Sequence, residues 1–108
     1  MKTIPILGRQ VNIAYNMAVQ ILFEDIVGKS ISEADLTLTR NSLALYYACI
    51  SVNNKDTDIT IDDLMYNISG EEMAILRVAV TESISEWSHI PSIMDDDKKE
   101  GDEASKKD

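Results

Sequence analysis

The sequence predicts a mainly α-helical (α+β) domain over residues 1–90, in which a small N-terminal β-hairpin packs on a bundle of about four helices. Apolar residues recur every three or four positions in several long segments, which is the spacing of amphipathic helices. Near the N-terminus they instead alternate with polar or small residues, as in strands. From residue 95 onward the chain has no large apolar residue, so residues 91–108 are predicted to be a disordered charged tail.

Residues 3–15 are predicted to form the hairpin. The alternating apolar side chains are Ile4, Ile6, Val11, Ile13 and Tyr15. Residues 7–10 supply the turn, and the second strand is expected at residues 10–14. Pro5 has no amide proton, so the first strand should lie at an edge of the sheet.

The first helix is predicted over residues 17–27. Asn16 is a favourable N-cap, and Gly28 stands where helices commonly end in a left-handed residue. The apolar face consists of Val19, Leu22, Phe23 and Ile26. After it, residues 32–35 are expected to start a short helical turn.

The second helix is predicted over residues 40–52, with Thr39 as its cap. Its sequence is apolar on more than one face, which is typical of a helix that is central or one that is partly exposed for a partner. The central position is favoured, but the apolar surplus also makes this helix the predicted partner-binding element. The proposed contact residues on it are Leu43, Tyr46, Tyr47 and Ile50.

Two further helices follow a polar loop at residues 53–58. Thr60 and Asp63 have the spacing of a capping box and begin a short third helix, and Ser69 with Glu72 begins a long one over residues 69–87. The long helix has a single apolar stripe, formed by Met73, Leu76, Val80, Ile84 and Trp87. Trp87 is expected to close the core, with an exposed protein-binding anchor as the alternative.

The charge of the chain argues against nucleic-acid binding. Nineteen acids and ten bases give a net charge of −9, of which −6 falls before residue 91. Such a surface repels phosphate backbones. No apolar run is long enough to cross a membrane, and the single cysteine, Cys49, excludes a disulfide within the chain, so a cytoplasmic location is predicted.

Catalytic, metal-binding and cofactor-binding residues are not predicted anywhere in the chain. His89 is the only histidine and Cys49 lies in an apolar segment, so neither a zinc site nor an activated thiolate is expected. The acid pairs at residues 62–63 and 71–72 fall in the first turns of predicted helices, where acids offset the helix dipole. The sequence therefore indicates a non-enzymatic protein.

The order of these parts resembles the tail assembly chaperones of long-tailed bacteriophages and prophages. The hairpin ILGRQVNIAY comes first, then the glycine-terminated helix NMAVQILFEDIVGKSI and the alanine-containing helix LALYYACISV. The threonine-capped helix TIDDLMYNI and the long helix EEMAILRVAVTESISEW complete the resemblance, which covers residues 4–88.

The resemblance implies a protein that binds the tape-measure protein, keeps it soluble and helps to recruit tail-tube subunits, without entering the mature virion. It also suggests self-association. Because tape-measure proteins present long amphipathic helices, we expect an apolar groove with an acidic rim, formed by the second helix. An alternative is a small acidic regulatory protein of the antitoxin or anti-repressor type, which occludes a basic partner surface.

Overall fold

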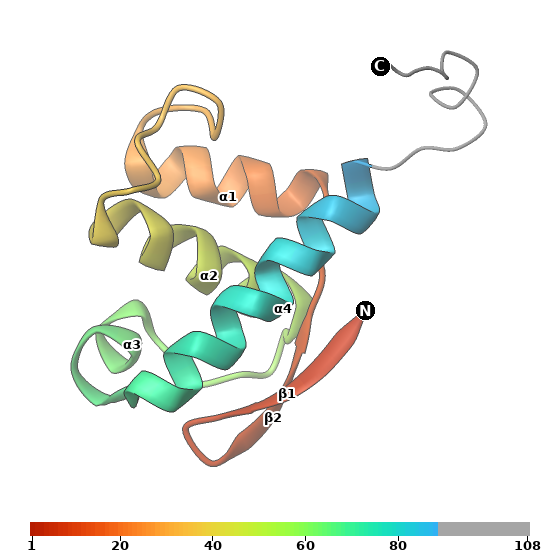
Figure 1. Ribbon diagram of the computed structural model, residues 1–108, viewed down its shortest axis with the longest axis vertical. Helices are drawn as coiled ribbons and strands as arrows, with labels where there is room; N and C mark the ends of the chain where they lie inside the picture. Colours follow the sequence, from red (N-terminus) through yellow and green to blue (C-terminus); the bar gives the residue numbers. More distant parts are fainter. Residues whose placement is uncertain (89–108) are drawn as a thin grey trace, which may run out of the picture.

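The computed structural model describes residues 1–88 and has the predicted architecture. A two-stranded antiparallel hairpin precedes four helices (Figure 1). The elements are β1 (Lys2–Ile6), β2 (Arg9–Ile13), α1 (Met17–Val27), α2 (Thr39–Asn53), α3 (Ile61–Asn67) and α4 (Gly70–Ser88). His89 and the predicted disordered tail at residues 91–108 lie outside the described residues.

The hairpin turn is tighter than predicted. Arg9 pairs with Ile6 and Gln10 with Pro5, so the loop contains only Leu7 and Gly8. Both loop residues have positive φ angles, 53° and 79°, as in the type I′ turns that match the twist of a two-residue hairpin. The second strand accordingly begins at Arg9, one residue before the predicted start, and ends at Ile13.

Each outer edge of the hairpin has one position that cannot pair with a further strand. The backbone N–H of Asn12 donates to Asn54 Oδ1 at 2.9 Å, and Asn54 Nδ2 donates to the carbonyl oxygen of Asn12 at 2.8 Å. These backbone groups of β2 therefore point away from β1. Asn12 pairs with Thr3, so this is a pair without hydrogen bonds between the strands. Bonded and non-bonded pairs alternate in an antiparallel ladder, so the Pro5–Gln10 pair, two residues further along, is also non-bonded. The ring nitrogen of Pro5 therefore points to the outer edge of β1. Pro5 is an edge residue, as predicted.

Helix α1 has the predicted ends. Asn16 Oδ1 accepts a hydrogen bond from the backbone N–H of Val19 at 3.1 Å. At the other end Gly28 has φ 85°, and its N–H donates to the carbonyl oxygen of Glu24 at 2.8 Å. Two local sequence features therefore determine where this helix begins and ends.

The loop before α2 differs from the prediction. Residues 32–35 form turns and not helix, and Leu38, with no side-chain cap bond, takes the N-cap position in place of Thr39. The expectation that Thr39 caps the helix is therefore wrong. Side chains of the first turn hold the loop instead: Asn41 Nδ2 donates to the carbonyl oxygen of Asp35, and Ser42 Oγ donates to that of Leu36.

Helices α3 and α4 both begin with the predicted capping boxes. In α3, the N–H of Asp63 donates to Thr60 Oγ1 at 3.1 Å and the N–H of Thr60 donates to Asp63 Oδ2 at 2.9 Å. In α4, Glu72 and Ser69 exchange the equivalent bonds at 3.0 and 3.1 Å. Each box satisfies two backbone donors that the helix itself leaves free.

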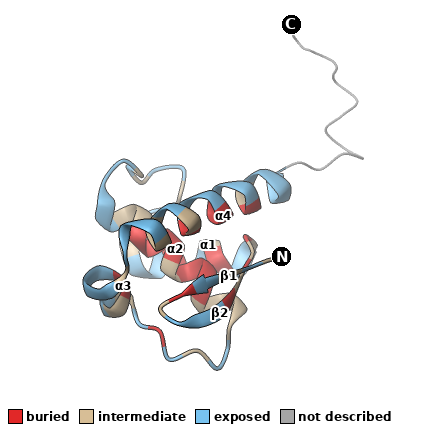
Figure 2. Ribbon diagram, turned by 60° about the horizontal axis from the view of Figure 1, so that its bottom comes forward, coloured by how far each residue is buried: buried red, intermediate tan, exposed pale blue. Residues whose placement is uncertain are grey.

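Helix α2 is the centre of the fold. It packs against α1, α3, α4 and β2, and α4 crosses both α2 and the hairpin (Figure 1). Figure 2 shows the buried residues gathered along α2 and on the sides of the other elements that face it. In the stripe of α4, Leu76 and Val80 are buried, Met73 and Ile84 are half-buried, and Trp87 is 40% exposed.

Candidate protein-binding groove

An open groove of about 840 Å³ lies between the end of α1, the first turns of α2, helix α3 and the start of α4. We call it the α1–α4 groove. Its large apolar lining residues include Ile26, Leu43, Met65, Tyr66, Ile68 and Met73. All four helices contribute to its walls, and the volume is in the range of about 300–1,000 Å³ that is usual for binding sites in proteins.

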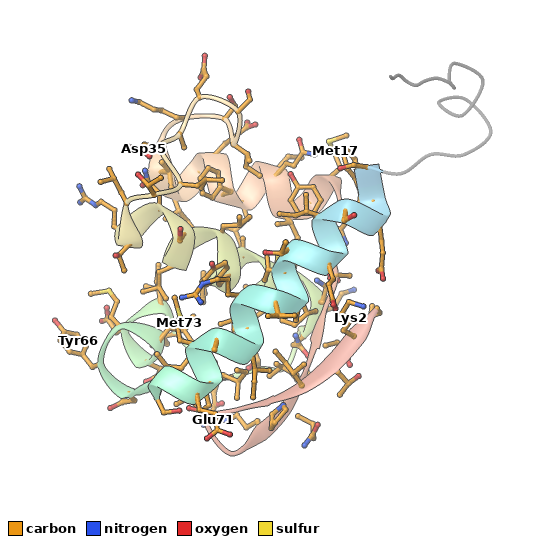
Figure 3. The ribbon with its side chains drawn as sticks, viewed as in Figure 1. Lys2, Met17, Asp35, Tyr66, Glu71 and Met73 are labelled. Carbon is orange, nitrogen blue, oxygen red and sulfur yellow. The ribbon has the colours of Figure 1, made fainter. Side chains whose placement is uncertain are left out.

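The exposed apolar surface of the groove comes mainly from α3. This helix has seven residues and buries one large side chain, Leu64. Met65 is 53% exposed and Tyr66 is 78% exposed, the largest fraction among the large apolar residues of the described chain. Figure 3 shows Tyr66 pointing away from the outer side of α3, and Met73 on the part of α4 that faces α2 and α3. Ile26 adds exposed surface from the end of α1.

The walls of the groove are anchored by hydrogen bonds outside it. Glu72 uses one carboxylate oxygen for the capping box of α4, and the other, Oε2, accepts a hydrogen bond from the backbone N–H of Leu7 at 2.8 Å. The N–H groups of Ser69 and Leu7 hold the pKa of Glu72 below its usual value, because they stabilise its charged form. This carboxylate therefore joins the beginning of α4 to the hairpin turn.

The charges at the groove differ from the expected acidic rim. Among residues 1–88, Arg40 is the one charged residue in the lining, and none of the acids of that part of the chain lines the groove. Arg40 is exposed and forms no ion pair within residues 1–88. Lys2, in contrast, lies 3.4 and 3.1 Å from carboxylate oxygens of Glu82 and Glu86. The groove therefore combines apolar walls with one uncompensated cation.

Several acids of the domain have local partners. Asp58 forms two contacts of 2.9 Å with the guanidinium of Arg9, which ties the hairpin to the loop before α3. Asp63 and Glu72 accept backbone N–H groups, and Glu82 and Glu86 flank Lys2. These carboxylates connect neighbouring elements or cap helices and so stabilise the fold locally.

The predicted contact residues do not form an exposed surface. Tyr46 and Ile50 are buried in the core, Tyr47 is half-buried, and Leu43 is 7% exposed at the wall of the groove. The expectation that α2 carries spare apolar surface is therefore wrong, because the hairpin and three helices cover it.

Trp87 lies at the opposite end of α4 from the groove. Its ring contacts that of Tyr15 edge-on, with centroids 5.3 Å apart and planes at 79°. This geometry is favourable for aromatic pairs and covers the edge of the core. The same ring remains 40% exposed. Trp87 thus contacts the core residue Tyr15 at the edge of the core, while part of its own surface stays accessible.

Met65, Tyr66, Ile26 and Met73 were not predicted as site residues. A pattern in the sequence was available for two of them. In a two-turn helix that packs on one side and buries Leu64, the next two residues are turned about 100° and about 200° away from that side. Adjacent Met65 and Tyr66 were therefore candidates for exposed apolar surface.

The thiol of Cys49 is buried, and this burial raises its pKa to about 12. A thiolate is the reactive form of cysteine, so this side chain is chemically inert in the folded state. Residues 1–88 contain no cluster of three or more His, Cys, Asp or Glu that could hold a metal ion. Within that same part of the chain, none of the helices combines the length and apolarity that a membrane span requires.

No protein-family model, curated protein or solved structure matches this chain.

Proposed function

We propose that the protein is a non-enzymatic tail assembly chaperone of a long-tailed bacteriophage or prophage. In this role it binds the tape-measure protein in the cytoplasm of the bacterial host and helps to recruit tail-tube subunits. The α1–α4 groove carries the proposal, because it offers an apolar, four-walled surface to an amphipathic helix. The order of hairpin, four helices and charged tail supports the assignment through its resemblance to the tail chaperones.

The groove has the side chains that helix recognition requires. Met65 and Met73 are flexible and polarisable, which suits a surface that must accept a client with many different apolar faces. Tyr66 adds a rigid aromatic ring of the kind enriched at binding hot spots. Burying the exposed parts of Ile26, Met65 and Tyr66 stabilises a complex by about 1 kcal/mol each, since full burial of a large apolar side chain contributes about 1.5–3 kcal/mol.

Co-expression with the tape-measure protein encoded beside it tests the proposal. We expect the wild-type chain to yield a soluble complex, and Tyr66→Asp to reduce the soluble tape-measure protein severalfold, because it places a charge in an apolar contact. Val78→Asp is the matched control, since Val78 is 54% exposed on α4 and does not line the groove. Circular dichroism would establish that both variants fold.

A second measurement separates groove binding from charge mimicry. A complex held by apolar contacts should persist as the salt concentration rises, whereas one held by acids on a basic surface should weaken sharply. The proposal is wrong if the tape-measure protein stays insoluble beside abundant wild-type chain. It is also wrong if the two aspartate variants behave alike.

A further inference from the structure

The groove has a second chemical property besides its apolar walls. Arg40 lies in its lining, and Arg77 follows Met73 by four residues, so it lies on the same face of α4 one turn away. Both arginines are exposed, and neither forms an ion pair within residues 1–88. In a domain with a net charge of −6, two uncompensated arginines beside one apolar groove favour an occupant that is apolar and acidic.

The chain itself contains a segment with this chemistry. Residues 90–97 read IPSIMDDD, in which Ile90, Ile93 and Met94 are followed at once by three aspartates. The apolar residues match the walls of the groove, and the carboxylates match Arg40, with which they can form charge-assisted hydrogen bonds.

The apolar residues of this segment follow the end of α4 too closely to fill the groove of their own molecule. The groove lies at the start of α4, where Met73 is fifteen residues before Ser88, a distance of about 22 Å along the helix. Fully extended, the chain from Ser88 spans at most about 7 Å to Ile90, about 18 Å to Ile93 and about 22 Å to Met94. Only Met94 could therefore reach Met73 in the same molecule, and Ile90 and Ile93 stop short of it. Figure 1 shows α3, the outer wall, at the far end of the fold from the end of α4.

We propose that the α1–α4 groove binds residues 90–97 of a second copy of this chain. Ile90, Ile93 and Met94 lie against the apolar walls, and the aspartates of residues 95–97 contact Arg40. Two molecules that each bind the segment of the other form a closed dimer. If each molecule instead binds the segment of the next one, an open polymer forms. Since a client helix would use the same groove, self-association also competes with client binding.

Sedimentation velocity of the full-length protein over a range of concentrations tests this interaction without any client. We expect the wild-type chain to self-associate. Arg40→Glu should raise the dissociation constant about tenfold or more, because it replaces an attraction by a repulsion at the centre of the contact. The triple variant Asp95→Lys, Asp96→Lys, Asp97→Lys should do the same, and combining it with Arg40→Glu should restore most of the affinity.

Lys55→Glu is the control, because it makes the same change in charge at an exposed loop residue outside the groove. It should leave the dissociation constant within about twofold of wild type, since rim or remote charges contribute little to affinity. A wild-type chain that stays monomeric overturns the proposal, as does an equal effect of Arg40→Glu and Lys55→Glu or a failure of the combined variant to recover. Because no tape-measure protein is present, these outcomes leave the proposed chaperone function unaffected.

Discussion

Replacing Glu72 by alanine tests how the groove is anchored. The variant removes the capping-box bond to Ser69 and the bond to the N–H of Leu7. Ser69 still caps the helix in this variant, so the loss is that of the reciprocal bond from the N–H of Ser69, about 1 kcal/mol. Loss of the partly buried hydrogen bond from Leu7 costs about 1 kcal/mol more after allowance for solvent. We therefore expect the free energy of unfolding to fall by about 2 kcal/mol.

Asp63→Ala is the matched comparison. Asp63 holds the same position in the capping box of α3 but has no bond to another element among the described residues, so we expect a loss of about 1 kcal/mol. Urea unfolding followed by circular dichroism measures both variants, and a lower midpoint with an unchanged slope would indicate a change in stability alone. Equal losses would refute the tertiary role assigned to Glu72.

The pH dependence gives an independent check on the same carboxylate. The pKa of Glu72 is lowered in the folded protein. The stabilisation that the Glu72 carboxylate gives to the folded state is thus fully present above the ordinary glutamate pKa of about 4.3. It is lost as the pH falls through the lower pKa that Glu72 has in the folded protein. The difference in stability between wild type and Glu72→Ala should shrink over this acidic range, and a difference that is constant with pH would contradict the assigned charge effect.

Two further predictions concern the backbone and the core. Gly28→Ala should lower the free energy of unfolding, measured in urea, by about 1 kcal/mol. A Cβ added at Gly28 meets no other atom within 4 Å, so the loss comes from holding alanine in the left-handed conformation at φ 85°. Gly70→Ala, which also meets no atom but lacks a positive φ, should not destabilise the protein, and equal losses would contradict this reasoning. Cys49 should react with a thiol reagent only as the protein unfolds, since its thiol is buried with a pKa of about 12. Reaction of the native protein at the rate of a free thiol would show that the core opens readily.

Local features of the fold were predictable from the sequence. Asn16, Gly28 and the two capping boxes act on residues within one helical turn, so their residue types and spacing were sufficient. The predicted cap at Thr39 was wrong, because Thr39 is already the first residue of the helix. Asn41 and Ser42 bind carbonyl groups of the loop before the helix, and the spacing of cap residues does not reveal such contacts.

The candidate site could not be predicted in the same way. An apolar helix such as α2 has the same sequence pattern whether its neighbours cover it or leave it open. Tyr46 and Ile50 became core residues because elements from both ends of the chain surround α2. Met65 and Tyr66 were candidates for exposure only if Leu64 faces the core. That orientation depends on how α3 is turned against α2, which no periodicity within seven residues specifies.

The outer edges of the hairpin affect how readily the protein can aggregate by pairing its strands with those of other molecules. An exposed strand edge is a template for pairing with other chains and so for aggregation. On one side, Asn54 satisfies the outward backbone groups of Asn12 with a side-chain amide that takes the place of a third strand. On the other side, Pro5 presents no donor to an incoming strand. An incoming strand would therefore find fewer free backbone groups on this hairpin than on a bare two-stranded sheet.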